Sequence, residues 1–115
     1  MGNEKHLKFS SDLVPLVLSG EKTVTWRIDD DKDLQAGDVV MLLAQPDFKI
    51  FAKGVIDFVV IKTMGDIEES DFDGHERFAN HEEMLKVYSR YYDKDVNDDT
   101  HVKIVKFTLL EKFSS

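Results

Sequence analysis

The sequence predicts an α+β domain in which the strands curl into a small mixed β-barrel with two principal helices. The expected order is strand, helix, three strands, helix, strand, which is not the regular alternation of a parallel α/β fold. The chain has 115 residues, of which 42% are hydrophobic, enough for one core. No linker-like stretch divides it. We therefore expect one domain over residues 6–113, after a flexible N-terminal tail at residues 1–5.

The first elements are short. His6–Phe9 reads as a strand, and Leu13–Leu18 reads as a helix that Ser11 or Asp12 can cap, because their side chains accept hydrogen bonds from first-turn amides. We expect the helix to end at Gly20, which can adopt the left-handed conformation that most residues resist.

Three strands follow this helix. Lys22–Ile28 is rich in Thr, Val, Trp and Ile, and Val39–Ala44 is an apolar run behind a Gly-Asp turn. The next strand is long, and Gly54 inside it predicts a bulge. One face of this strand is expected to carry the alternating residues Ile50, Ala52, Gly54, Ile56, Phe58 and Val60.

The last helix and strand have clearer patterns. Asn80–Tyr92 predicts a helix that begins with a capping box formed by Asn80 and Glu83. The segment Val102–Leu110 is apolar on both faces, as expected for a central or barrel-closing strand. The helix has an apolar stripe made of Met84, Leu85, Tyr88, Tyr91 and Tyr92, which we assign to the core.

The charge composition limits the choice of partners. The chain has 15 Lys and Arg residues against 23 Asp and Glu residues, a net charge of −8. Non-specific binding of long duplex DNA depends on Lys and Arg, so this composition argues against it. A small ligand or a short RNA that is gripped locally remains compatible with the charge.

Several classes of site are excluded or disfavoured. The absence of cysteine excludes disulfides, a Cys-type zinc site and a thiol nucleophile. The start of the chain lacks an apolar signal region, and the longest apolar stretch, 50–61, contains Lys53 and Asp57 and is too short to span a bilayer. We therefore expect a cytoplasmic protein without membrane contact.

Two metal-like motifs fail on spacing. Asp93–Asp98 imitates the start of a calcium loop, but Asp98 stands where Gly is required and Ile104 where Glu is required. His75 and His81 are too far apart in sequence to share a helix face as zinc ligands. No glycine-rich nucleotide motif is present either. We expect neither a metal nor a cofactor.

The run GEKTVTWR, at Gly20–Arg27, gathers polar residues at a helix-to-strand transition. On a regular strand, Thr25 and Arg27 would share one face, while Lys22 and Trp26 would share the other. Lys22 can therefore join Thr25 only if it precedes the strand or if a bulge intervenes. The alternative is a surface lysine, an ordinary strand threonine and a solvated arginine, with the tryptophan in the core.

A second polar segment is DFDGHERF, at Asp71–Phe78. Its aromatic residues Phe72 and Phe78 are expected to anchor it to the barrel, so that Glu76 can be aimed inward. The alternative is a loop that exposes its charges to solvent.

The motifs GEKTVTWR, GDVV at 37–40 and DFDGHERF make nearly the whole chain resemble an ASCH domain, a branch of the PUA-like barrel superfamily. The resemblance implies a PUA-like barrel with a cleft between the barrel and these segments, and a role related to RNA or to modified nucleosides. It also resembles the branch whose members are amidohydrolases acting on N4-acetylcytidine through a Lys, a Thr and a Glu.

Carried over, that catalytic trio becomes Lys22, Thr25 and Glu76. Glu68, Glu69 and Asp73 are alternatives to Glu76 as the acid that the loop supplies. The resemblance implies that Thr25 is a nucleophile activated by Lys22 as a base, with Glu76 orienting the lysine or protonating the leaving amine. A lysine base must be neutral, and Arg27 or Arg77 can favour the neutral form.

The alternative function is a non-catalytic RNA-binding module, or a ribonuclease, that uses the same basic cleft. Trp26, Phe72 or Phe78 would then stack on a base. Lys22 would stay charged and contact phosphates together with Arg27 and Arg77, while Thr25 would only donate a hydrogen bond. A scaffold that holds a protein partner has the least support.

Overall fold

A computed structural model describes residues 5–29 and 32–113, so the expected N-terminal tail lies outside the described residues except for Lys5. The strands are β1 (Lys5–Phe9), β2 (Val24–Arg27), β3 (Val39–Ala44), β4 (Lys49–Thr63) and β5 (His101–Lys112). The α-helices are α1 (Val14–Ser19) and α2 (His81–Tyr92), and short 3₁₀ turns cover Ser11–Leu13, Met64–Asp66 and Glu69–Phe72.

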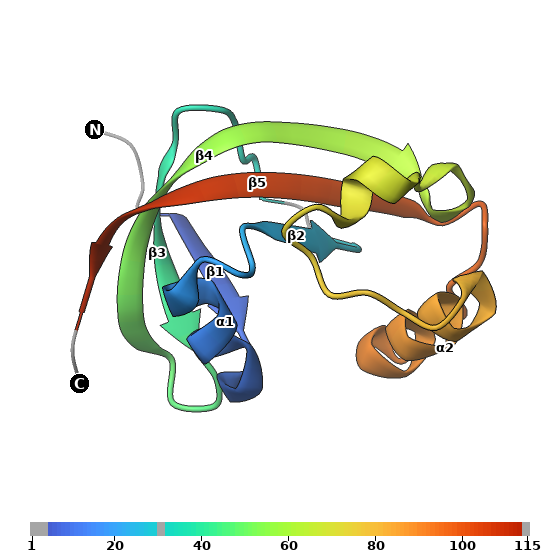
Figure 1. Ribbon diagram of the computed structural model, residues 1–115, viewed down its shortest axis with the longest axis horizontal. Coiled ribbons are helices and arrows are strands. Elements are labelled where there is room, and N and C mark those ends of the chain that lie inside the picture. Colours follow the sequence, from blue (N-terminus) through green and yellow to red (C-terminus); the bar gives the residue numbers. More distant parts are fainter. Residues whose placement is uncertain (1–4, 30–31, 114–115) are drawn as a thin grey trace.

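All the described strands form one mixed sheet in the order β1-β3-β4-β5-β2. β1 pairs with β3 in parallel, and the other pairs are antiparallel. The long strands β4 and β5 curl from one half of the molecule to the other, with α1 beside one half and α2 beside the other (Figure 1). The result is a half-barrel that leaves β1 and β2 as its two end strands, which confirms the predicted α+β curled barrel.

Apolar residues are buried on both faces of the sheet, in two clusters. One lies within the curl of β1, β3, β4 and β5 and includes Leu7, Phe9, Val40, Ile56 and Phe107. The other lies between the sheet and α2 and includes Val24, Trp26, Met84, Tyr88 and Ile104. β5 lies between β4 and β2 and supplies residues to both clusters, as its apolar pattern predicts.

The predicted alternation along β4 is wrong beyond Ile56. The register of β4 against β5 shifts at Gly54, as expected, and again between Ile56 and Phe58. The second shift makes Asp57 an extra residue, so every later side chain changes face. Phe58 and Val60 are consequently exposed, while Val59 packs against the first cluster. Ile50, at the start of the strand, is also exposed.

Two of the predicted helix ends are confirmed and one is not. Gly20 ends α1 with φ at 87°, and the Asn80 side chain accepts a hydrogen bond of 2.8 Å from the amide of Glu83 at the start of α2. The predicted cap of α1 by Ser11 or Asp12 is wrong, because both lie inside the preceding 3₁₀ turn. Among the described helices, none is long and apolar enough to cross a membrane.

Trp26 lies in the core, as expected, with 3% of its surface exposed. We predict that Trp26→Ala lowers the free energy of unfolding by about 3–5 kcal/mol, because it empties a large volume between the sheet and α2. Urea unfolding followed by circular dichroism measures this loss. The prediction that Tyr91 lies in the core is wrong, because it is 61% exposed, so Tyr91→Ala is the matched control and should cost below ~1 kcal/mol. A Trp26→Ala loss as small as that of the control would contradict the packing described.

Candidate functional site

A cavity of about 330 Å³ lies where the half-barrel is open, between the end strands β1 and β2. Its walls come from the end of β1, from β2, from the loop before α2 and from α2 itself. The volume falls in the range of small-molecule sites. The residues that give the cavity its chemistry are Phe9, Lys22, Thr25, Arg27, Glu76 and Tyr88.

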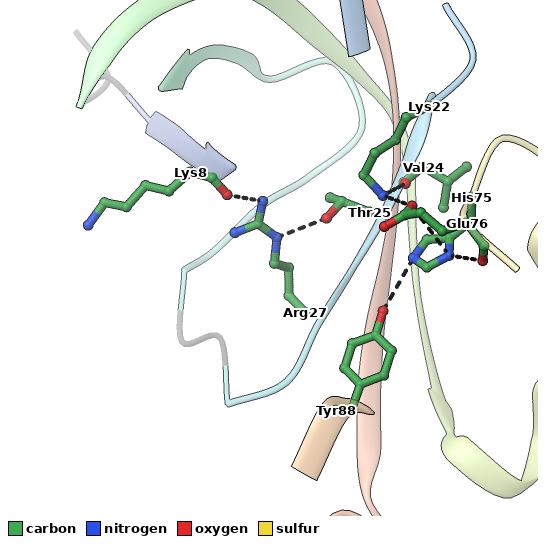
Figure 2. A network of polar contacts seen from close by, with 8 residues as sticks. All are labelled: Lys8, Lys22, Val24, Thr25, Arg27, His75, Glu76 and Tyr88. Atoms are coloured by element: carbon green, nitrogen blue, oxygen red, sulfur yellow. Dashed lines mark hydrogen bonds and ion pairs between the residues drawn. The ribbon is translucent and has the colours of Figure 1, made fainter. Parts of the chain in front are cut away.

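Lys22 reaches the cavity because β2 begins only at Val24, so the lysine precedes the regular strand. Its side chain is buried, with 3% of the residue exposed. The ammonium Nζ donates to the carbonyl of Val24 at 2.8 Å and to Glu76 Oε2 at 2.5 Å (Figure 2). A buried ammonium group is costly unless it is paired, and here a carboxylate and a backbone carbonyl share that task.

Glu76 is placed opposite Lys22 by the close approach of Gly74 to β2. The Gly74 carbonyl accepts hydrogen bonds from the amides of Thr23 at 2.9 Å and Val24 at 3.2 Å. Gly74 has φ at 77°, and a Cβ atom there would lie 2.1 Å from Thr23 Oγ1. Only glycine fits this position, so the loop can cross the start of β2 and deliver the next two residues to the cavity.

The other loop acids lie elsewhere. Glu68 pairs with Lys62 across 3.6 Å, and Glu69 pairs with Arg77. Asp73 is the residue that follows the 3₁₀ turn Glu69–Phe72, and it does not line the cavity. Glu76 is therefore the loop acid that the structure brings to Lys22.

Arg27 spans the opening between the two end strands. Its Nε donates to Thr25 Oγ1 at 3.1 Å, and its Nη2 donates to the Lys8 carbonyl on β1 at 2.7 Å. The guanidinium carbon also lies 5.0 Å from the centre of the Phe9 ring. Because the Thr25 oxygen accepts from Arg27, the threonine keeps its own hydroxyl hydrogen to donate.

His75 belongs to the same network, although its sequence pattern suggested no role beyond a metal motif that fails on spacing. Its Nδ1 lies 2.8 Å from the Glu76 carbonyl, and its Nε2 lies 3.3 Å from the Tyr88 hydroxyl. A carbonyl can only accept, so Nδ1 carries the hydrogen and Nε2 accepts from the tyrosine. The imidazole also stacks on the Trp26 ring at 3.9 Å between centres. Its position next to Glu76 in DFDGHERF is the one signal that points to it.

Of the two remaining predicted ligand-binding residues, Trp26 lines the cavity and Arg77 does not. Trp26 lines the cavity from the core side, and its indole Nε1 is buried without a hydrogen-bond partner among the described residues. Arg77 has an exposed side chain, which pairs with Glu69 and lies over the Phe72 ring. It does not line the cavity.

Burial sets the protonation behaviour of the cluster. Burial lowers the pKa of Lys22, and the Arg27 charge lowers it further, against the opposing effect of Glu76. Burial alone would raise the pKa of Glu76, but His75 and Lys22 outweigh it and hold that pKa below its ordinary value. Burial and the Lys22 charge lower the pKa of His75 to about 4. Burial and the Glu76 charge raise the pKa of Tyr88 well above its ordinary value.

These directions give the state of the site at neutral pH. Glu76 is a carboxylate, whereas His75 and Tyr88 are neutral. In residues 5–29 and 32–113, no three His, Asp or Glu side chains are grouped in a way that could hold a metal ion.

The geometry defines a small half-barrel with a partly buried cleft, lined by polar groups, at its open side. Solved structures share this fold. A protein of Enterococcus faecalis V583 described by the family model DUF984 aligns with 100% of this chain and 85% of its own, with a TM-score of 0.79 and 21% identity. No protein-family model matches the sequence, and no curated protein matches it.

Two ASCH-domain structures are also similar. The ASCH domain of Lactobacillus crispatus JV V101 aligns with 88% of this chain and 70% of its own, with a TM-score of 0.65 and 16% identity. The ASCH protein of Zymomonas mobilis aligns with 91% of this chain and 66% of its own, with a TM-score of 0.65 and 12% identity. The chain therefore has the ASCH-domain fold that its motifs predict.

The contact at Gly74 predicts a strong effect of a single methyl group. Gly74→Ala should lower the free energy of unfolding by roughly 2–3 kcal/mol, because the left-handed backbone and the clash with Thr23 Oγ1 act together. Urea unfolding measures the loss. Removing the hydroxyl with Thr23→Ala should reduce the cost of Gly74→Ala to that of the backbone alone, about 1 kcal/mol. An unchanged cost in the Thr23→Ala background would rule out the clash.

The lowered pKa of His75 predicts a pH-dependent stability. The unfolded chain binds the imidazole proton near pH 6.5, while the folded chain binds it at about 4. The contribution is complete above pH 6.5 and is lost as the pH falls towards 4, by up to about 3 kcal/mol. Unfolding measured from pH 7 to pH 4 should show this slope. His75→Gln cannot titrate, so it should be less stable at pH 7 but should lose less stability on acidification; a parallel pH profile would contradict the assignment.

Proposed function

We propose that the cleft binds an N-acylated nucleoside, such as an N4-acylated cytidine, free or in a short RNA, and hydrolyses the bond between the acyl group and nitrogen. The observation that carries this proposal is the buried Lys22, held at 2.5 Å from Glu76 in a cavity that Thr25 also lines. A cavity lined by a buried amine, a hydroxyl and a carboxylate has the parts needed for amide hydrolysis.

In the first step, the Thr25 oxygen attacks the acyl carbon while its proton passes to a neutral Lys22. The carbon–nitrogen bond breaks, and Lys22 gives that proton to the departing nucleoside amine. The acyl group is left as an ester on Thr25. Water then adds to the ester, again with Lys22 as the base, and the carboxylic acid leaves as the Thr25 oxygen recovers its proton.

The charges around Lys22 support the base role. Burial and Arg27 favour the neutral amine, whereas Glu76 favours the ammonium, and the lowered lysine pKa is the balance of the two. Because the pKa of Glu76 is also lowered, its carboxylate is ionised at neutral pH. It therefore orients Lys22 and does not protonate the leaving amine.

The polar groups of the cleft support a ligand that carries both donors and acceptors. Tyr88 donates its hydroxyl hydrogen to His75, so its oxygen is left to accept a hydrogen bond from a ligand N–H or O–H. On the other side, the guanidinium of Arg27 and the free hydrogen of Thr25 can donate. A nucleobase amide offers groups of both kinds.

A second candidate is a non-catalytic RNA-binding module. The ion pair between Lys22 and Glu76 favours this alternative. If Glu76 keeps Lys22 charged, the lysine can contact a phosphate but cannot act as a base. Lys8 and Arg27 line the cavity as further cations.

Incubation with N4-acetylcytidine, with product mass as the readout, distinguishes the two. Hydrolysis should release acetate, and Lys22→Ala, Thr25→Ala and Glu76→Ala should each reduce the rate by at least about 100-fold, because residues that act as a unit fail together. Lys86→Ala, an exposed position on α2 outside the cavity, is the matched control and should keep the rate.

Circular dichroism of each variant separates loss of activity from loss of fold. Turnover that survives in the folded Lys22→Ala and Thr25→Ala variants would eliminate the mechanism. An absence of turnover, together with RNA binding that weakens with salt and with Arg27→Ala, would support the binding module.

A further inference from the structure

The second half of β4 has an open edge. β3 pairs with β4 only over Lys49–Val55, and the next residue, Ile56, bonds to Gly37 and Asp38. Over residues 58–63, β4 pairs with β5 on one side, and no described strand pairs with it on the other. Figure 1 shows this half of β4 running along the rim of the sheet without a strand beyond it. An open edge carries unpaired amide and carbonyl groups that can pair with another strand.

The hydrogen bonds fix which backbone groups point outward. Ile56 directs its N–H and C=O away from β5, to Asp38 and Gly37, and its partner Phe107 directs its N–H to Thr23. The two residues are therefore a non-hydrogen-bonded pair of the β4–β5 ladder. Bonded and non-bonded pairs alternate, so Phe58 bonds to β5, and the outward groups beyond the bulge belong to Val59, Ile61 and Thr63.

The side chains along this edge are apolar and exposed. Phe58, Val60 and Ile61 are 42%, 39% and 63% exposed. Natural edge strands are commonly protected by charges. Here the two flanking charges are engaged, because Lys62 bonds to Asp71 and Asp57 accepts from Thr108.

We propose that this edge pairs with the same edge of a second copy of the chain, antiparallel, with a two-fold axis at Val60. In this register Val59 lies opposite Ile61 of the other copy, and both present outward backbone groups, as a hydrogen-bonded pair requires. Val60 lies opposite its own copy in a non-hydrogen-bonded pair. The sheet then continues through the interface into the second copy.

The sequence of the edge is complementary to itself in this register. On one face Val60 meets Val60 and Phe58 meets Lys62, whose carbon stem can lie along the ring while its ammonium stays bonded to Asp71. On the other face Val59 covers Ile61. No like charges face each other, which matters for two chains that each carry −8. This complementarity favours a second copy over an unrelated strand.

The absence of cysteine makes a direct test available. In a non-hydrogen-bonded pair the Cα atoms lie about 4.5 Å apart, within disulfide range. Val60→Cys should therefore form a covalent dimer under glutathione redox buffer, seen on a non-reducing gel. Leu110→Cys, at an exposed apolar position of β5, is the matched control and should stay monomeric.

Analytical ultracentrifugation of the wild-type protein should give a dimer mass that dissociates on dilution. Ile61→Lys should raise the dissociation constant at least tenfold while the far-ultraviolet spectrum stays native, because the Ile61 side chain is 63% exposed. A wild-type monomer at about 0.5 mM, equal cross-linking of Leu110→Cys, or an unchanged dimer of Ile61→Lys would each overturn the proposal.

Discussion

The burial of the Lys22 ammonium group constrains the rest of the site. A charge in this position must have a partner, and that partner, Glu76, comes from a loop more than fifty residues away in the sequence. The loop can reach it only because Gly74 lies directly against the start of β2. His75, Trp26 and the helix behind them then pack around the same contact. One ion pair thus joins the barrel to the loop and to α2.

The open side of the half-barrel is where this contact can be used. A closed barrel would pair β1 with β2 and would fill the space that the cavity occupies. In the half-barrel, the Arg27 side chain connects the two end strands instead of a backbone ladder. Its guanidinium donates to the Lys8 carbonyl on β1 and to the Thr25 hydroxyl on β2. A side-chain bridge holds the two end strands at a distance that leaves room for a ligand, whereas a backbone ladder would not.

Much of this could be predicted from the sequence, and the failures have physical causes. The succession of strands and helices along the chain follows from the hydrophobic period and from Gly20 and Asn80, which act locally. The side-chain directions of Arg77 and His75 depend on how the loop docks, which no local pattern records. Lys22 could be assigned to the site only conditionally, because its entry into the cavity that Thr25 lines depends on where β2 begins.

The faces of Phe58 and Val60 were predicted wrongly because periodicity assumes that every residue of a strand takes one step in the ladder. Asp57 takes none: Ile56 and Phe58 pair with consecutive residues of β5, Phe107 and Lys106. At this bulge β4 therefore contains one residue more than the paired segment of β5. Removing Asp57 would leave each later side chain on its present face of the sheet. Removing Val59 would instead move every later side chain of the strand to the opposite face. Within β4, tolerance of a lost residue is confined to the bulges.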